Sequence, residues 1–183
     1  KIPKQKLSVL KKNIISKKKI VHFFNASEKN KNLKSVNLIL NKLFKFNFNR
    51  NDCIISFGGG IVGDVSGFAA SIFKRGLKFV NIPTTLLAQI DSSIGGKTGV
   101  NNKYGKNLIG SFMQPDLVIS DVNMLNSLPK REIICGYGEI LKHSIIANKN
   151  FYNFLDKNSN KIFSLSSPFI EKAILESCKI KKR

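Results

Sequence analysis

The stretch DCIISFGGGIVGDVSGFAASIF, residues 52–73, determines the fold expected for this chain. Its start, residues 52–57, is a short apolar run that is typical of a buried strand. Three glycines follow, and the small and apolar residues 64–73 then predict a helix. A strand that passes through a glycine turn into a helix is the opening unit of a parallel α/β sheet.

The segments after this unit continue the alternation of strand and helix. Residues 77–83 and 116–121 are apolar runs that predict two further strands. Residues 84–94 begin with a threonine suited to capping a helix, so they are expected to be helical. The glycine-rich residues 95–107 are expected to form a polar loop. This order predicts a parallel sheet that helices cover on both faces.

The N-terminal 50 residues are basic and weakly patterned. Residues 20–24 are interpreted as a short strand. Leu33, Val36, Leu40 and Leu43 recur at helical spacing, which predicts an amphipathic helix.

The character of the chain changes after Pro129, where only helical patterns remain, over 130–148, about 150–157 and 168–181. We therefore place a domain boundary near residue 122. Residues 1–121 are expected to form an α/β domain, and residues 122–183 the start of a helical domain.

Composition limits the class of function. The formal net charge is +20, which raises the alternative of a basic nucleic-acid-binding module. The lysines are scattered without interleaved aromatic residues, so no nucleic-acid partner is expected, and a basic cleft for an anionic small molecule explains the charge equally well. The sequence contains no apolar run of 18 residues, so no membrane span is expected. Three widely spaced cysteines suit a reducing, cytoplasmic location.

The glycine turn has the spacing of a dinucleotide-binding motif. Gly58, Gly60 and Gly63 follow a strand and open a helix, whose N-terminal N–H groups can bind a pyrophosphate. The usual acidic residue about 20 positions later is missing, because that region is KFVNIPTT. A tight turn without any ligand therefore remains an alternative on this motif alone.

The sequence Gly95-Gly96-Lys97-Thr98 is not a good phosphate-binding P-loop. A Walker A motif needs glycine where this chain has Asp91, whose carboxylate would repel phosphates. Asp91, Lys97, Lys106 and Asn107 instead suit a ligand that carries both hydroxyl groups and an anion. The alternative is a solvated charged loop.

Four segments resemble the 3-dehydroquinate synthase family: GGGIVGDVSGFAASIFKRG (58–76), NIPTTLLAQIDSSIGGKTGVN (81–101), GKNLIGSFMQP (105–115) and GYGEILK (136–142). The resemblance runs from about residue 26 to the C-terminus. Its most specific part, residues 83–101 with GKNLIG, distinguishes this family from the related glycerol and iron-dependent alcohol dehydrogenases.

The resemblance implies a Rossmann-like NAD-binding domain followed by a helical metal and substrate domain. It also implies a lyase of the shikimate pathway, which leads to chorismate and the aromatic amino acids. Enzymes of the family convert 3-deoxy-D-arabino-heptulosonate 7-phosphate into 3-dehydroquinate and phosphate, and they use NAD and a divalent metal, zinc or cobalt. A transient ketone acidifies the neighbouring C–H bond, and NAD+ is regenerated within the site.

The resemblance places the cofactor contacts in four segments and at two separate lysines. Ala26 to Lys31 is similar to a DGExxK stretch, with Ala26 and Ser27 in place of Asp-Gly, and Ser127 stands where threonine is common. The implied NAD-binding residues are Ala26, Ser27, Glu28, Lys29, Asn30, Lys31, Gly60, Ile61, Val62, Gly63, Asp64, Thr84, Thr85, Lys97, Lys106, Met124, Leu125, Asn126 and Ser127.

The resemblance also implies substrate and metal contacts. The implied catalytic residues are Asp91, Lys97, Asn107, Lys142 and Arg75. Arg75 is similar to an arginine that reaches the phosphate in a neighbouring subunit, which makes a homodimer the expected unit, while a surface cation at a helix end is the alternative. Glu139 is similar to a metal ligand, and His143, at i+4 from Glu139, is not assigned as one because the matching family position is not a ligand.

The match stops short of the family's two metal-binding histidines. The chain contains only His22 and His143, and it ends at ESCKIKKR. One carboxylate does not hold a catalytic zinc ion, which normally has three protein ligands. The chain is therefore expected to be a partial one that is inactive alone. A related sugar-phosphate cyclase and a decayed gene product remain alternatives.

Overall fold

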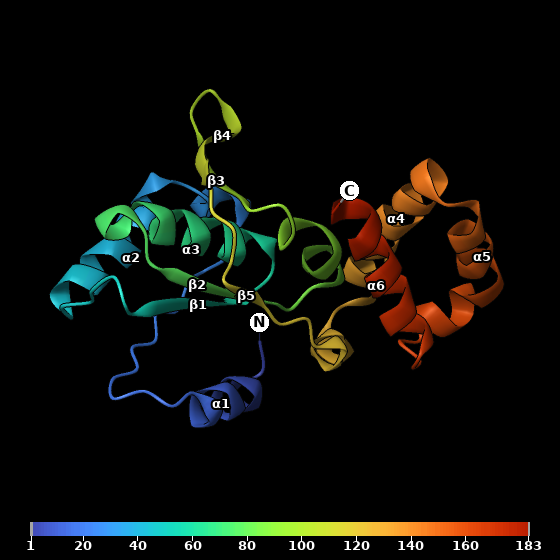
Figure 1. The fold of residues 1–183 in the computed structure, drawn as a ribbon, viewed down its shortest axis with the longest axis horizontal. Coiled ribbons are helices and arrows are strands. Elements are labelled where there is room, and N and C mark those ends of the chain that lie inside the picture. Colours follow the sequence, from blue (N-terminus) through green and yellow to red (C-terminus); the bar gives the residue numbers. More distant parts are fainter. Residues whose placement is uncertain (1, 183) are drawn as a thin grey trace.

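The computed structural model describes residues 2–182, which divide between a part built around a sheet and a group of three helices (Figure 1). The sheet consists of β1 (Cys53–Gly58), β2 (Lys78–Pro83) and β5 (Leu117–Val118) in the order β1-β2-β5. Both pairs are parallel, and Cys53 lies opposite Lys78. The predicted parallel sheet is confirmed, although β5 is shorter than the predicted strand 116–121.

Helix α3 (Gly60–Ile72) packs on the sheet, and α2 (Leu33–Lys45) packs on α3. The apolar positions predicted for α2 serve this contact, because Val36 is fully buried in a cluster with Val65 and Phe68 of α3. The helix begins at Asn32, whose side-chain oxygen accepts a hydrogen bond of 3.1 Å from the Ser35 N–H. This cap satisfies one of the N–H groups that a helix start leaves without a partner.

The opposite face of the sheet is not covered as predicted. Helix α1 (Lys4–Asn13) lies on that side in Figure 1, but none of its residues is buried. The strand predicted at 20–24 is also wrong, because this segment pairs with no strand. Its Val21 carbonyl accepts a hydrogen bond from Lys42 Nζ, and Phe24 packs against the α2–α3 cluster. Side-chain packing thus replaces strand pairing here.

The polar loop predicted at 95–107 is in fact most of a hairpin. Strands β3 (Lys97–Asn102) and β4 (Gly105–Phe112) are antiparallel, and the hairpin projects from the rest of the molecule (Figure 1). Gly99 lies opposite Gly110, where a Cβ on Gly110 would lie 2.1 Å from the Thr98 carbonyl oxygen. The glycines therefore allow two backbones to approach closely, and they do not indicate a loop.

The helix predicted at 84–94 is shorter and of a different type. Residues 86–87 are α-helical and lead directly into η3 (Ala88–Ser92), which is a π-helix. The predicted threonine cap is confirmed, because Thr85 Oγ1 accepts a hydrogen bond of 3.2 Å from the Ala88 N–H. Gly95 and Gly96 follow with φ of 91° and 67°, which ends helical structure before β3.

Helices α4 (Lys130–Ala147), α5 (Lys149–Phe163) and α6 (Phe169–Lys182) match the three predicted helices, and α5 is longer than expected. Their core includes the fully buried Ile140, Leu155 and Ile162. Leu86 and Ile90, beside and within η3, are fully buried in the same core. The boundary near residue 122 therefore stays a prediction, since a segment before it packs with the helices. No helix within residues 2–182 is long and apolar enough to cross a bilayer.

Candidate functional site

The glycine turn joins β1 to the N-terminus of α3. A Cβ on Gly60 would lie 2.8 Å from Ser92 Oγ, and one on Gly63 would lie 3.3 Å from Asn81 Nδ2. These glycines let the start of α3 lie against η3 and β2. Ile61 and Val62 complete the first turn of α3, where backbone N–H groups and the helix dipole favour an anion.

A buried ion pair connects this turn to two other segments. Lys31, which is 6% exposed, places Nζ 2.5 Å from Asp64 Oδ2 and 2.6 Å from Asn107 Oδ1. Burial raises the pKa of Asp64, and the hydrogen bond and charge of Lys31 oppose that rise. One ammonium group thus joins the N-terminal segment, the start of α3 and the hairpin.

The N-terminal segment is fixed along the hairpin by η1 (Glu28–Asn30). Glu28 Oε1 accepts a hydrogen bond of 2.8 Å from Asn101 Nδ2 and lies 3.8 Å from Lys106 Nζ. The Asn101 hydrogen bond is the main cause that lowers the pKa of Glu28, and the charges of Lys106 and Lys31 add to it. The Asn101 N–H also donates to the Lys31 carbonyl oxygen at 2.8 Å.

Ala26, Ser27 and Lys29 belong to the same turn. The Ser27 carbonyl oxygen accepts a hydrogen bond from the Asn30 N–H, and that of Lys29 accepts one from Asn32 Nδ2. Their backbone shapes the segment that presents Glu28 and Lys31 to the hairpin.

Two threonines lie between β2 and η3, on the side of the glycine turn. The Thr84 N–H donates to the Gly58 carbonyl oxygen at 2.9 Å, and a Cβ on Gly59 would lie 3.2 Å from Thr85 Cγ2. The structure therefore brings the two threonines to the glycine turn.

The predicted segment Met124 to Ser127 lies in η4 (Val122–Ser127) and is not part of this network. The Leu125 side chain is fully buried in the helical core, so it does not face a cofactor. Ser127 Oγ is 3.4 Å from the Met124 carbonyl oxygen, and Asn126 lies between them. Any contact of Leu125 with a dinucleotide would have to involve its backbone.

A second group of polar side chains lies where η3 meets α4. Asp91, Glu139 and His143 each place one potential ligand atom within 4.8 Å of the other two. Two ammonium groups neutralise the carboxylates: Lys142 pairs with Glu139, and Lys181 Nζ lies 2.7 Å from Asp91 Oδ1. The negative charge of Asp91 contributes to the raised pKa of Asp64, which links this group to the Lys31 network electrostatically.

Lys181 is not among the residues predicted for the site, and His143 was predicted not to be a metal ligand. Lys181 is in the last turn of α6, within a run of lysines typical of a solvated helix end, and its partner Asp91 lies 90 positions earlier in the chain. His143 had one detectable signal, its i+4 spacing from Glu139, but its burial and its partners depend on the packing of α6 on α4.

The side chains of Lys97 and Arg75 make no hydrogen bond or ion pair with other residues in the range 2–182. Lys97 is exposed at the first position of β3. Arg75 is exposed in η2 (Phe73–Arg75) with φ of 68°, at the C-terminal end of α3. The 13 residues of α3 span about 20 Å. Arg75 is therefore far from the glycine turn of its own chain.

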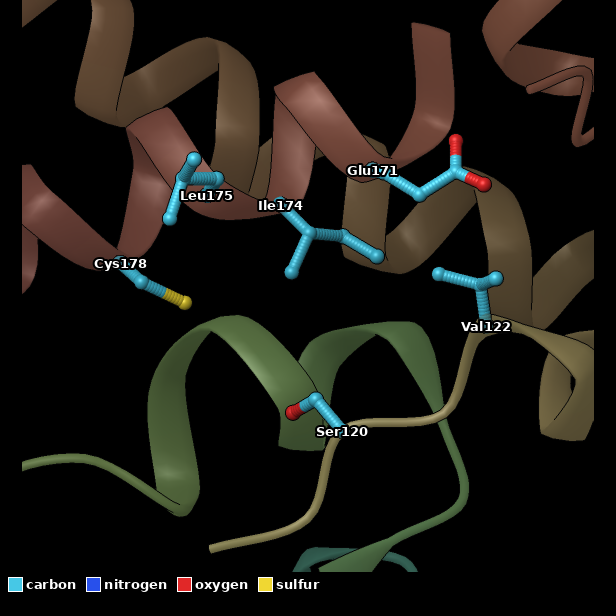
Figure 2. Close-up of a pocket in the computed structure, with 6 residues that line it drawn as sticks. All are labelled: Ser120, Val122, Glu171, Ile174, Leu175 and Cys178. Atoms are coloured by element: carbon cyan, nitrogen blue, oxygen red, sulfur yellow. The ribbon is translucent and has the colours of Figure 1, made fainter. Parts of the chain in front are cut away.

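A separate pocket of about 230 Å³ lies between α6 and residues 120–122 (Figure 2). Ile174, Leu175 and Cys178 line it from α6, and Glu171 lies at one end of this row. It contains none of the residues predicted for the site.

The residues present fit both ligands that the resemblance implies, a nicotinamide dinucleotide and a divalent metal. A helix N-terminus after a glycine turn suits a dinucleotide pyrophosphate, and Glu28 offers a carboxylate to a hydroxyl group. Two carboxylates and an imidazole within 4.8 Å make a chemically suitable donor set for a divalent metal such as zinc.

Comparison with known proteins gives a consistent result. The family model for the 3-dehydroquinate synthase N-terminal region matches residues 21–135, and that for the C-terminal region matches residues 136–183. The 3-dehydroquinate synthase of Pelagibacter ubique (strain HTCC1062) is 70% identical over 182 residues, which is 100% of this chain and 50% of the relative.

Solved structures of two other cyclases are also similar. A 2-epi-5-epi-valiolone synthase from Streptomyces hygroscopicus subsp. jinggangensis 5008, with NAD+ and Zn2+ bound, has a TM-score of 0.82 and 28% identity over 86% of this chain and 44% of its own. A 2-deoxy-scyllo-inosose synthase complexed with carbaglucose-6-phosphate, NAD+ and Co2+ has a TM-score of 0.64 and 35% identity, covering 66% and 33%. The chain spans about half the length, or less, of the curated relatives it matches.

Proposed function

The chain belongs to the 3-dehydroquinate synthase family, and we propose that it forms the dinucleotide-binding part and the first section of the substrate site of such an enzyme. The proposed reaction converts 3-deoxy-D-arabino-heptulosonate 7-phosphate into 3-dehydroquinate and phosphate, and the proposed location is the cytoplasm. When bound, NAD+ would supply a hydride acceptor that oxidises one substrate hydroxyl group and later returns the hydride.

The observation that best supports this proposal is the position of Lys31. Its ammonium group contacts Asp64, a proposed cofactor residue, and Asn107, a proposed substrate residue. A buried cation with both partners fixes the start of α3 relative to the hairpin. This arrangement can hold a nucleotide and a substrate side by side, which hydride transfer between them requires.

Each proposed contact has a chemical role. The turn from Gly60 to Asp64 binds the pyrophosphate through backbone N–H groups, while Glu28 accepts hydrogen bonds from ribose hydroxyl groups. Thr84 and Thr85 orient the cofactor, and Lys106 adds positive charge.

The substrate residues divide by charge. Asp91 accepts hydrogen bonds from substrate hydroxyl groups, and Lys97, Asn107 and Lys142 donate to its oxygen atoms. Arg75 binds the phosphate of the substrate in a second copy of the chain, which requires a homodimer. Glu139 binds the divalent metal, and the identity of that metal follows from the donors that join it.

The first test is NAD+ binding to the 183-residue chain, measured by calorimetry. We expect Gly60→Ala to abolish binding, because its Cβ would lie 2.8 Å from Ser92 Oγ and would displace the start of α3. Gly138→Ala is the matched control, since a Cβ there meets nothing within 4 Å. Equal NAD+ affinity in both variants, or no affinity in the wild type, would contradict the proposal.

The second test concerns Lys97 in a chain completed with the other half of its relatives' length. Lys97→Ala is expected to lower turnover by roughly 100-fold or more through lost electrostatic stabilisation. The exposed position makes a change in stability beyond about 0.5 kcal/mol unexpected. Near-normal turnover would refute the role of Lys97, and product analysis would separate this activity from that of another sugar-phosphate cyclase.

A further inference from the structure

We propose that His143 is a positioning residue for Glu139. In this role its Nε2–H group holds the carboxylate oxygen Oε1, which leaves Oε2 as the oxygen that binds the divalent metal, and Ser177 fixes the imidazole ring. The inference rests on the proposed function, because it concerns the metal that Glu139 is proposed to bind. It gives a role to a buried histidine that the proposed reaction does not otherwise use.

The two carboxylate oxygens of Glu139 have different surroundings. His143, at i+4 on α4, places Nε2 3.2 Å from Oε1, and Lys142 Nζ contacts the same oxygen. Among residues 2–182, no group donates a hydrogen bond to Oε2. Each oxygen of a carboxylate can accept hydrogen bonds or bind a cation. The contacts of Glu139 within the protein therefore leave one oxygen available to a metal.

The direction of the hydrogen bond follows from the chemistry of its two ends. An ionised carboxylate only accepts, so Nε2 of His143 must carry the proton. The other ring nitrogen, Nδ1, lies 2.7 Å from Ser177 Oγ of α6. When the Ser177 hydroxyl group donates to Nδ1, it fixes the tautomer that is protonated at Nε2. A protonated Nε2 has no lone pair for a metal, so His143 acts through Glu139 and not as a ligand.

Burial makes this support rigid. His143 is 5% exposed and Ser177 is fully buried, so neither group can exchange its partner for bulk water. A ligand carboxylate that is hydrogen-bonded by such a residue is held in one orientation. Loss of a supporting partner of this kind typically lowers metal affinity by about 10- to 100-fold.

The helix that carries Ser177 is itself fixed at the site. Ser177 and Lys181 are at i and i+4 of α6, so they share one face of this helix. Lys181 Nζ lies 2.7 Å from Asp91 Oδ1 on η3. The same face of α6 thus contacts α4 through Ser177 and η3 through Lys181, and its docking supplies a fixed hydroxyl group to the His143 ring.

Two other roles of His143 predict different results. As a direct ligand, its Nε2 atom would have to lose its proton and its hydrogen bond to Glu139, and replacing His143 would change the spectrum of the bound metal. As a residue that only fills space between α4 and α6, it would be replaceable by any side chain of similar size without loss of metal affinity.

The first experiment is a Co2+ titration of the chain completed with the other half of its relatives' length, measured by calorimetry and visible absorption. We expect His143→Leu to weaken Co2+ binding by about 10- to 100-fold, while the absorption spectrum keeps its shape because no ligand is lost. His143→Gln keeps an N–H donor near the position of Nε2 and should recover most of the affinity. His22→Leu is the matched control, with no expected change.

Two results of this titration would overturn the proposal. A changed absorption spectrum in His143→Leu would identify His143 as a ligand. Equal Co2+ affinity in His143→Leu and His143→Gln would show that the N–H donor does not matter.

A second measurement needs no metal and no variant of His143. In the 183-residue chain with 15N-labelled histidine, NMR should detect one slowly exchanging imidazole proton on Nε2. That signal should remain in His22→Leu, and it should exchange faster in Ser177→Ala. A His143 ring that carries its proton only on Nδ1 would contradict the proposal.

The outcomes separate this inference from the proposed function. If Glu139→Gln loses Co2+ affinity in the completed chain while His143→Leu keeps it, only the role of His143 is refuted, and the proposed function stands. If Glu139→Gln binds Co2+ with wild-type affinity, the proposed metal role of Glu139 fails, and the role of His143 fails with it.

Discussion

At the scale of single residues, the Lys31–Asp64 pair shows that a site residue can be both structural and functional. Lys31 is almost completely buried, so removing one partner would leave an uncompensated charge. Asn107 takes part in the same contact with a left-handed φ of 57°, a conformation that asparagine tolerates better than most residues. Through Asn107, the Lys31–Asp64 pair therefore also holds the hairpin in position.

Asp64 gives a prediction about pH. Burial raises its pKa above the ordinary value of 3.8, so the folded chain binds this proton more tightly than the unfolded chain. The contribution of Asp64 to the free energy of unfolding is therefore lost as pH rises from 3.8 through the folded pKa. We expect the wild type to lose stability relative to Asp64→Asn over that window, as measured by urea denaturation at a series of pH values.

Glu28→Gln is a control with the opposite sign. The pKa of Glu28 is lowered, so its contribution is present above the unfolded pKa and is lost as pH falls through the folded value. The Glu28 side chain is exposed, which makes the effect small. If the free energies of unfolding of the wild type and of Asp64→Asn change in parallel with pH, the raised pKa assigned to Asp64 is wrong.

Residue patterns predicted much of the candidate site, but only part of its contacts. The segments with Glu28, Lys31, Asp64, Lys106 and Asn107 were identified from their resemblance to the family, and the structure brings them together. The contacts of Lys181 and His143 were not predictable, because they depend on how α6 packs. A lysine at a helix end has the same pattern whether it is solvated or paired.

At the scale of elements, one wrong prediction occurred at glycines, because glycine is found both in loops and where two strands approach each other closely. The glycines of residues 95–107 indicated a loop, yet Gly99, together with Gly110 beyond that range, permits close contact between two strands. The three C-terminal helices were predicted well, because their long apolar repeats have a helical period. The π-helix was not predicted, since its extra residue per turn depends on local packing and leaves little sequence signal.

Two glycines on α4 give a matched prediction. A Cβ on Gly136 would lie 2.6 Å from Leu86 Cγ and 2.9 Å from the Leu87 backbone nitrogen, so Gly136→Ala should cost about 1–3 kcal/mol. A Cβ on Gly138 meets nothing within 4 Å, so Gly138→Ala should stabilise the helix by about 0.5–1 kcal/mol. Chemical denaturation of both variants measures the difference.

At the scale of the whole molecule, the candidate site lies where the sheet-containing part meets the three helices. Asp91 comes from η3, whereas Glu139 and His143 come from α4 and Lys181 comes from α6. The charges at this junction are balanced in pairs, with Lys142 on Glu139 and Lys181 on Asp91. A divalent cation that binds Glu139 would release the Lys142 ammonium group within a chain that has a net charge of +20.

This exchange predicts that metal and anion binding are coupled. The Lys142 ammonium group that the metal frees can pair with a phosphorylated sugar, so saturating Co2+ should raise the affinity for glucose 6-phosphate by about 5- to 150-fold. By linkage, the sugar phosphate must raise Co2+ affinity by the same factor. Calorimetry at low ionic strength is the appropriate measurement, because Lys142 is exposed and salt screens its charge. Direct binding of the phosphate to the metal would give the same gain in Lys142→Met, whereas release of the lysine requires the gain to shrink in that variant.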